Sequence, residues 1–322
     1  MLPKIDLCDG RDEKRILEDL RTAIIEYGAF YVKFPSVSLV DSELFSQAKQ
    51  LFSTAPDERK SIRNQGFIRG FIENGQESGS DSKEEKEGFS FGVDISTKPQ
   101  NKLEGPNVDW PEGMDSKPLM HLLNTCQEIT YVLTRLLSIL FTGDESSWMD
   151  LCQAGDRISI MRVFHYFAMD ISSLGSSAHT DWGFLSFIKA QETIPGLQVA
   201  QKGAHGELTW QDVPAIPPGE STCQDWFICN AGDFLSMITK GNVLSPLHRV
   251  ISTSAERTAF VYFAYPSYNA PIPAFLSPNM SLYQDQSATT TNSIGVRRVE
   301  KIQDFDSFGD FIFEKWNSVS RY

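Results

Sequence analysis

The sequence predicts a mainly β protein in which short strands form a sandwich or barrel and a helical N-terminal half supports them. Apolar residues recur at helical spacing before residue 156, whereas short β-prone segments separated by Gly, Pro or Asn follow from residue 157. The chain has 322 residues, of which 41% are hydrophobic and 22% charged, so it can bury a sizeable core. We expect one integrated domain over 1–322, with a support and substrate-lid region (1–156), a β core (157–275) and a C-terminal tail or helix (276–322).

Two segments of the N-terminal half predict helices most clearly. Residues 12–28 place Ile16, Leu17, Leu20, Ile24 and Ile25 on one face, and Gly28 is a typical stop. The segment "AFYVKF" (29–34) then has the composition of a strand. Residues 117–142 form the longest apolar-periodic segment and predict one long packed helix.

Between these segments the pattern is weaker. Residues 41–53 predict a helix with Asp41 or Ser42 as its N-cap. Residues 62–118 are rich in Gly, Ser, Pro and charge, and we expect them to be irregular. The charge run "DSKEEKE" (81–87) within them is typical of a solvated loop or helix face.

The C-terminal half contains the predicted strands. They are bounded by turn residues and lie at fairly regular spacing, as in a sandwich or barrel. The segments are "RISIMRVFHYF" (157–167), "GFLSFIKA" (183–190), "GLQVA" (196–200), "DWFICN" (225–230), "DFLSMIT" (233–239) and "RTAFVYFAY" (257–265).

The net charge and the cysteine content limit which binding partners and which cellular setting we expect. The formal net charge of −13 makes nucleic acid an improbable ligand. The five cysteines are scattered without a Cys-x2-Cys pair, which favours reduced thiols in a cytoplasmic protein over disulfides or a zinc knuckle. We see neither a secretory signal nor an apolar stretch of about 20 residues, so no membrane partner is expected, and the sequence sets no oligomeric state.

The stretch "SSAHTDWGFLSF" (176–187) contains a candidate metal half-site. In a strand, residues i and i+2 point to the same face, so His179 and Asp181 would project together while Thr180 points away. A histidine from a neighbouring strand would complete a two-His-one-carboxylate triad, which suits non-haem Fe(II). A lone histidine is more often structural, and a structural zinc site would be closed and usually include thiolates.

The stretch "SPLHRVISTSAERTAFVYF" (245–263) supplies the third histidine through a resemblance. "HTD", then "HRV", then an Arg nine positions beyond that His resemble the Fe(II)/2-oxoglutarate-dependent oxygenases, and most of all the branch that includes isopenicillin N synthase and the plant flavonoid and gibberellin dioxygenases. Further landmarks follow in family order: "PKIDL" (3–7), "YGAFYVKFPSV" (27–37), "LFSTAPDERKSI" (51–62), "GFIRGFI" (66–72), "KEGFSFG" (86–92), "MRVFHYF" (161–167), "GLQV" (196–199), "ICNAGDFL" (228–235) and "AYPSYNAPIPA" (264–274).

The resemblance implies an architecture and an activity. The core would be a double-stranded β-helix, a distorted cupin-like jelly roll with helices on one side. His179, Asp181 and His248 would bind Fe(II), while Arg257 and Tyr166 would bind the co-substrate 2-oxoglutarate. The reaction would use O2, release succinate and CO2, and oxidise an unactivated C–H of a small-molecule metabolite by hydroxylation, desaturation or ring closure. No separate protein acid or base is expected.

Two departures from the family pattern concern 2-oxoglutarate. Ala259 stands where relatives have the serine of Arg-x-Ser, and Phe164 stands where many have the asparagine of Asn-x-Tyr. One hydrogen bond contributes about 0.5–1.5 kcal/mol, so the loss would weaken co-substrate binding without abolishing it. An iron oxidase of the isopenicillin N synthase type and a non-catalytic cupin-like binding protein stay open as alternatives. A zinc hydrolase is disfavoured because no glutamate is placed as a general base.

The substrate contacts are the least determined part of the sequence. The cavity would be lined by the irregular region and the C-terminal tail, with Trp182, Arg69, Phe71, Phe89 and Phe91 as candidates. Arg69 could instead be a solvated surface residue, and the aromatic residues could be core. His165 is expected to point away from the face that Tyr166 occupies, because neighbouring strand residues alternate.

Overall fold

A computed structural model describes most of the chain. The described residues are 1–8, 10, 12–35, 39–62, 68–76, 84–93, 101–153, 157–169, 173–191, 195–202, 207–275 and 305–319. Within them, no helix has both the length and the apolar character needed to cross a bilayer.

Two sheets form the core, as expected for a double-stranded β-helix. The large sheet has eight strands in the order β1-β2-β10-β7-β12-β5-β4-β3, and the small sheet has four in the order β6-β11-β8-β9. The bounds of the large sheet are β1 Lys4–Asp6, β2 Ala29–Lys33, β10 Trp226–Ala231, β7 Leu185–Ala190, β12 Arg257–Ser267, β5 Arg157–Tyr166, β4 Lys86–Phe91 and β3 Gly70–Ile72. Those of the small sheet are β6 Leu174–His179, β11 His248–Ile251, β8 Leu197–Lys202 and β9 Leu208–Asp212.

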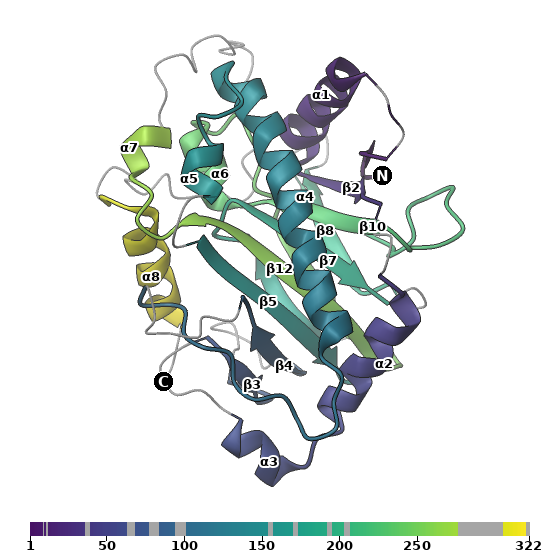
Figure 1. Cartoon of the computed structure of the whole chain (residues 1–322). Coiled ribbons are helices and arrows are strands. Elements are labelled where there is room, and N and C mark those ends of the chain that lie inside the picture. Colours follow the sequence, from purple (N-terminus) through teal and green to yellow (C-terminus); the bar gives the residue numbers. More distant parts are fainter. Residues whose placement is uncertain are drawn as a thin grey trace.

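Helices cover one face of the large sheet. Figure 1 shows the long helix α4 lying across β5, β7 and β12, while α8 lies beside one end of β12. The helical elements are α1 Glu13–Thr22, π-helix η1 Ala23–Tyr27, α2 Asp41–Phe52, α3 Pro56–Ser61, α4 Lys117–Thr142, α5 Met149–Gln153, α6 Asp233–Ile238, α7 Ile272–Phe275 and α8 Phe308–Val319. The expected helices over 12–28 and 117–142 are therefore confirmed, and the backbone of Gly28 is left-handed (φ 68°) as a helix stop requires.

Strand alternation divides the large sheet between two hydrophobic clusters. On β5, Val163 belongs to the larger cluster beneath the helices, whereas Phe164 and Tyr166 belong to the smaller cluster between the sheets. Arg257 of β12 pairs directly with Tyr166, and Ala259 pairs with Phe164. Directly opposed residues share a face, so these side chains lie on the inner face, towards the small sheet.

The expectation of irregular structure over 62–118 is wrong in two places. β3 and β4 form the edge of the large sheet, and α4 has already begun by the end of that range. The charge run 81–87 is also not a solvated face in its described part: Glu84 and Glu87 are only 5% and 8% exposed. Charged residues fit in these positions because each carboxylate has a cation beside it, Lys86 for Glu84 and Arg59 for Glu87.

The segment 233–239, expected as a strand, is the helix α6. Phe234, Leu235 and Ile238 are all fully buried, at the i, i+1 and i+4 spacing of a helix face rather than in strand alternation. The N-cap expectation for 41–53 also needs correction, since Val40 is the cap residue and no side chain caps α2. The Asp41 carboxylate instead forms an ion pair with the buried Lys189 ammonium, whose Nζ lies 3.0 Å from Asp41 Oδ2.

Candidate metal centre

The two predicted half-sites meet at one place. One potential ligand atom from each of His179, Asp181 and His248 lies within 4.8 Å of the others. His248 opens β11, and it pairs directly with His179 at the end of β6. The strand argument for Asp181 is wrong, because β6 ends at His179 and Asp181 lies in the loop beyond it. The loop nevertheless turns the carboxylate to the same side, with Asp181 Oδ1 3.9 Å from His248 Nε2.

Backbone carbonyls fix the tautomers of both histidines. The Nδ1 atoms lie 2.7 Å from the Ser177 oxygen for His179 and 3.1 Å from the Pro246 oxygen for His248. A carbonyl oxygen can only accept, so both Nδ1 atoms carry the proton. Each Nε2 therefore keeps its lone pair, and this is the form that binds a metal ion. The two rings are 4.3 Å apart between centroids and tilted by 53°.

The Asp181 carboxylate is buried and oriented by its own partners. Ser186 on β7 donates to its Oδ2 at 2.5 Å, which leaves Oδ1 directed towards His248. The backbone of the loop is fixed by the start of α6, where the N–H of Asp233 donates to the Asp181 backbone oxygen at 2.7 Å. The segment that sequence analysis misassigned as a strand therefore holds the metal-site loop.

A close backbone contact joins that loop to α6. A Cβ on Gly232 would lie 2.1 Å from the Gly183 oxygen, and one on Gly183 would lie 2.1 Å from the ring of Tyr265. Neither position can carry a side chain without moving the loop that bears Asp181. These two glycines are site-forming residues that the sequence motifs did not identify.

His179 is the most accessible of the three ligand candidates. His179 is exposed as a whole residue, whereas His248 is 4% and Asp181 8% exposed. Crowding by protein atoms around the ring, together with the neighbouring His248, lowers the pKa of His179, although Asp181 acts in the opposite direction. A lowered pKa keeps the imidazole neutral, as metal coordination requires.

Arg257 and Tyr166 lie together between the two sheets. The guanidinium carbon of Arg257 is 4.8 Å from the centroid of the Tyr166 ring, and both residues are buried. Within the described part of the chain, Nε and Nη1 of Arg257 have no hydrogen-bond partner. A buried cation with free donors is costly unless an anion pairs with it, so this position suits a carboxylate ligand. Burial lowers the pKa of Arg257 in keeping with this.

Of the five substrate candidates, only Trp182 lies beside the metal-site residues. It directly follows Asp181, and its ring meets that of Trp316 on α8 edge to face at 5.3 Å. The guanidinium of Arg162 stacks on the other ring of this pair, 4.8 Å from the Trp316 centroid. Arg162 shares the inner face of β5 with Tyr166. Sequence analysis missed Arg162 and Trp316, although strand alternation from Tyr166 would have placed Arg162 on the inner face.

The other four candidates are parts of the core. Arg69 is 3% exposed and forms a buried ion pair with Glu104 at 3.1 Å, so the surface interpretation is wrong. The rings of Phe71, Phe89 and Phe91 are buried in the large cluster beneath the helices. Their positions explain their residue types without a substrate.

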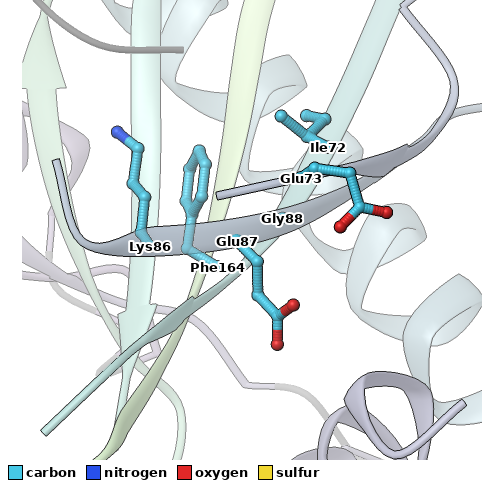
Figure 2. A pocket seen from close by; sticks show the side chains of 6 residues that line it. All are labelled: Ile72, Glu73, Lys86, Glu87, Gly88 and Phe164. Atoms are coloured by element: carbon cyan, nitrogen blue, oxygen red, sulfur yellow. The ribbon is translucent and has the colours of Figure 1, made fainter. Parts of the chain in front are cut away.

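His165 faces away from the site, as expected from alternation. Its Nδ1 lies 2.8 Å from Glu87 Oε1, and its ring packs 5.3 Å from that of Phe52 on α2. Figure 2 shows Glu87 and Lys86 leaving opposite sides of β4, with Lys86 on the side of Phe164. The inner face thus carries Lys86 and Phe164, and the outer face carries Glu87 and His165.

Comparison with known protein families assigns the chain to a family. Residues 2–113 match the family described as the N-terminal region of the non-haem dioxygenase in morphine synthesis. Residues 157–266, which include the whole metal cluster and Arg257, match the 2OG-Fe(II) oxygenase superfamily. The chain belongs to the 2OG-Fe(II) oxygenase superfamily. This oxygenase is accordingly an oxidoreductase of the dioxygenase class that uses Fe(II), 2-oxoglutarate and O2.

Individual relatives resemble the oxygenase over most of its length. The 2-oxoglutarate-dependent dioxygenase traH of Penicillium crustosum is 27% identical and aligns over 86% of this chain and 88% of its own. Clavatol oxidase claD of the same fungus is also 27% identical, over 89% and 90%. A homoarginine-6-hydroxylase of Arabidopsis thaliana is 33% identical, but over only 51% of this chain and 48% of its own.

Solved structures confirm the fold. A full-length Neurospora crassa protein in complex with alpha-KG superposes with a TM-score of 0.73 at 18% identity, covering 98% of this chain and 96% of its own. A putative 2OG-Fe(II) oxygenase family protein from Caulobacter crescentus also gives a TM-score of 0.73 at 18% identity, covering 99% of both chains. The double-stranded β-helix expected from the sequence is therefore confirmed. The comparisons do not favour the non-catalytic binding protein or the 2-oxoglutarate-independent oxidase.

Proposed function

We propose that His179, Asp181 and His248 hold the catalytic Fe(II) and that Arg257, backed by Tyr166, binds the far carboxylate of 2-oxoglutarate. The oxygenase would use this site to oxidise a C–H bond of a small-molecule metabolite. The observation that carries the proposal is the arrangement of three oriented metal donors and one buried guanidinium between the same two sheets. Two N–H groups of that guanidinium have no partner among the residues that the structure describes.

The donor set suits Fe(II) better than structural zinc. Two neutral imidazoles and one carboxylate form a facial triad that leaves further coordination positions for other ligands. No cysteine joins the cluster in the described part of the chain. Burial, and then the nearby Asp181, raise the pKa of the Cys229 thiol well above its ordinary value, so this thiol stays protonated and is a poor metal ligand.

Arg257 supports the 2-oxoglutarate assignment. Its donors can form a charge-assisted, bidentate contact with a carboxylate, and the Tyr166 ring keeps the guanidinium in place. Gly196 allows the close approach, since a Cβ there would lie 2.6 Å from Arg257 Nη1. Because Ala259 replaces the usual serine on this wall, Arg257 would carry most of the binding of that carboxylate.

The protein's own residues position the reactants and exclude water. When bound, the iron supplies the oxidising chemistry through O2 and the decarboxylation of 2-oxoglutarate to succinate and CO2. Ser177, Pro246 and Ser186 would hold the three ligands. The Trp182 ring, which follows Asp181 and packs against Trp316, would reduce the access of water to the substrate. No described residue needs to act as an acid or a base.

For the substrate, we infer a small metabolite that contacts the wall formed by Trp182, Trp316 and Arg162. Two relatives carry names of small-molecule oxidation, a clavatol oxidase and a homoarginine-6-hydroxylase. Stacked indole and guanidinium groups favour a planar or aromatic substrate.

We also infer the cellular setting and the domain organisation. The free thiols support a cytoplasmic location. The matched regions and the pairing of β2 with β10, which are far apart in sequence, support one integrated domain.

Succinate formation tests the proposed function. The purified enzyme with Fe(II) and ascorbate is assayed for succinate and O2 uptake against planar small metabolites, with His248→Ala as the metal-site variant. We expect equimolar succinate and O2 consumption that disappears in His248→Ala. O2 uptake by the wild-type enzyme without succinate would contradict the proposal and favour the oxidase chemistry.

A further inference from the structure

The backbone of Glu84 and Glu85 links the large sheet to strand β6 of the small sheet. Glu84 precedes β4 at the edge region of the large sheet and forms an isolated parallel bridge with Leu174, the first residue of β6. The next N–H, that of Glu85, donates to the Leu174 oxygen at 3.1 Å. β6 is the edge strand of the small sheet and ends at His179, so this segment supports the strand that carries a ligand.

The Glu84 carboxylate is buried and fully engaged. Its Oε1 accepts the backbone N–H of Ser177 at 2.7 Å, and its Oε2 lies 2.7 Å from the Lys86 ammonium. Burial opposes its ionisation, but Lys86 and Ser177 outweigh that effect and lower the pKa of Glu84. A buried carboxylate in such an arrangement has little freedom to move.

Lys86 holds Glu84 in place from the inner face of β4. Its Nζ also lies 3.3 Å from Ser176 Oγ and 5.0 Å from the centroid of the Phe164 ring. In Figure 2 Lys86 and Phe164 lie on the same side of the strand, opposite Glu87. The ammonium is thus fixed by a carboxylate, a hydroxyl and an aromatic face.

Ser177 connects this ion pair to the metal ligand. Its N–H is held by Glu84, and its carbonyl accepts the Nδ1–H of His179 at 2.7 Å. His248 and Asp181 are enclosed by the fold, whereas His179 is exposed as a residue and lies at the end of an edge strand. The orientation of His179 therefore depends on the position of Ser177 more than that of a buried ligand would.

We propose that Glu84, held by Lys86, is a positioning residue for His179: it fixes Ser177, whose carbonyl sets the tautomer and direction of the imidazole. This inference rests on the proposed metal triad. Hydrogen-bond partners in the outer shell of a metal site change metal affinity by about 10–100-fold. Here the support would act through one intervening residue of an edge strand.

The test compares Glu84→Ala with Glu84→Gln. The amide oxygen of Gln can still accept from Ser177, but it carries no charge. Glu85→Gln is the matched control, because the Glu85 side chain is near the surface, where it accepts from Asn74 at 3.0 Å. Affinity for Co(II), a spectroscopic substitute for Fe(II), is measured by visible absorption without 2-oxoglutarate or substrate, and circular dichroism checks that each variant is folded.

We expect Co(II) affinity to fall about 10-fold or more in Glu84→Ala, to recover largely in Glu84→Gln and to be unchanged in Glu85→Gln. Equal losses in Glu84→Ala and Glu84→Gln would overturn the positioning role and leave only a charge effect. An unchanged affinity in both would also overturn it. If Glu84→Ala does not fold, Glu84→Asp takes its place, because its carboxylate keeps the charge but is one methylene too short to hold the Ser177 N–H at the present 2.7 Å. A Co(II) affinity about 10-fold lower in Glu84→Asp than in Glu84→Gln supports the role, and equal affinities contradict it.

Proton NMR of the Co(II) protein provides a readout that general destabilisation would not produce. Each coordinated imidazole should give one paramagnetically shifted, exchangeable Nδ1–H signal. We expect the His179 signal, identified by its loss in His179→Ala, to exchange faster with solvent in Glu84→Ala while the His248 signal is unchanged. Identical exchange of both signals in wild type and variant would contradict the inference. If wild-type protein binds Co(II) no better than His179→Ala or His248→Ala, the triad itself fails instead.

Discussion

The metal end and the anchor end of the site are built from different kinds of element. At the metal end, the proposed ligands come from an edge strand, a loop and the start of a short strand, and protein groups hold each of them. At the anchor end, Arg257 and Tyr166 face each other on two long, central, paired strands. There, Nε and Nη1 of the guanidinium have no hydrogen-bond partner among the described residues.

The difference indicates how each end is prepared for its ligand. The metal donors need orientation, because imidazole and carboxylate can turn away from an ion, and hydrogen bonds supply it. The anchor needs an unpaired charge in a rigid place, which β12 and β5 provide through strand pairing. Perturbing one end should therefore leave the other largely intact.

Removing a ligand from the metal end should have the largest effect. We expect Asp181→Ala to lose Fe(II) affinity by more than the roughly 100-fold that outer-shell changes reach, and to lose turnover with it. Asp212→Ala on the exposed strand β9 is the control. Equilibrium dialysis of Fe(II) under argon measures the affinity, and full activity in Asp181→Ala would show that the site has been misassigned.

Removing the anchor should affect the co-substrate and spare the metal. Arg257→Ala loses a charge-assisted contact of about 1.5–3 kcal/mol, which corresponds to an increase of about 10–100-fold in the KM for 2-oxoglutarate. Fe(II) affinity should stay within about 3-fold of wild type, since the guanidinium is not among the ligand candidates. Arg15→Gln, at an exposed position of α1, serves as control. An unchanged KM in Arg257→Ala would exclude the anchor role.

Two glycine-to-alanine variants can perturb the metal end and the anchor end separately, because each adds a methyl group beside only one of them. In Gly232→Ala the new methyl would meet the Gly183 backbone, which cannot yield easily, whereas in Gly196→Ala it would meet the end of the Arg257 side chain. Overpacking costs about 1–3 kcal/mol, so both should lower the denaturant midpoint. We expect Gly232→Ala to weaken Fe(II) binding and Gly196→Ala to weaken 2-oxoglutarate binding. The reverse pattern would refute the separation.

Restoring the missing hydroxyl should have the smallest effect. Ala259→Ser places an O–H on the same strand face as Arg257, where it can donate to the same carboxylate. A hydrogen bond of about 0.5–1.5 kcal/mol predicts a decrease of about 2–10-fold in the KM for 2-oxoglutarate. Titration of 2-oxoglutarate at saturating Fe(II) measures it, and a raised KM would mean that 2-oxoglutarate binds in another orientation.

Local patterns predicted the parts of the fold with strong periodicity. The apolar repeat over 117–142 gave the bounds of α4, and the family motif gave the metal cluster and Arg257. The segment 233–239 was misassigned because a six-residue helix with several buried apolar residues resembles a strand in sequence. β4 was missed because its charged residues are neutralised by partners such as Arg59, which no local pattern reveals.

The proposed substrate wall of Trp182, Trp316 and Arg162 lies beyond local sequence reasoning for a related reason. Trp316 is far from Trp182 in sequence, and only the packing of α8 against the end of the large sheet brings the two rings together. The Phe71, Phe89 and Phe91 side chains have equally aromatic surroundings in sequence, but they are buried inside the large cluster, whereas Trp182 packs against that cluster and is only partly buried. The degree of burial in the folded chain, which no local pattern reveals, therefore separates these aromatic residues.

Anaerobic binding of both cofactors tests the central claim most directly. Fe(II) is added to the wild-type protein under argon, 2-oxoglutarate is titrated, and the visible spectrum is recorded beside those of Asp181→Ala and Arg257→Ala. We expect a weak metal-to-ligand charge-transfer band in wild type, no band in Asp181→Ala, and a band in Arg257→Ala only at higher 2-oxoglutarate concentration. Wild-type protein that binds iron but shows no band at saturating 2-oxoglutarate would contradict the account.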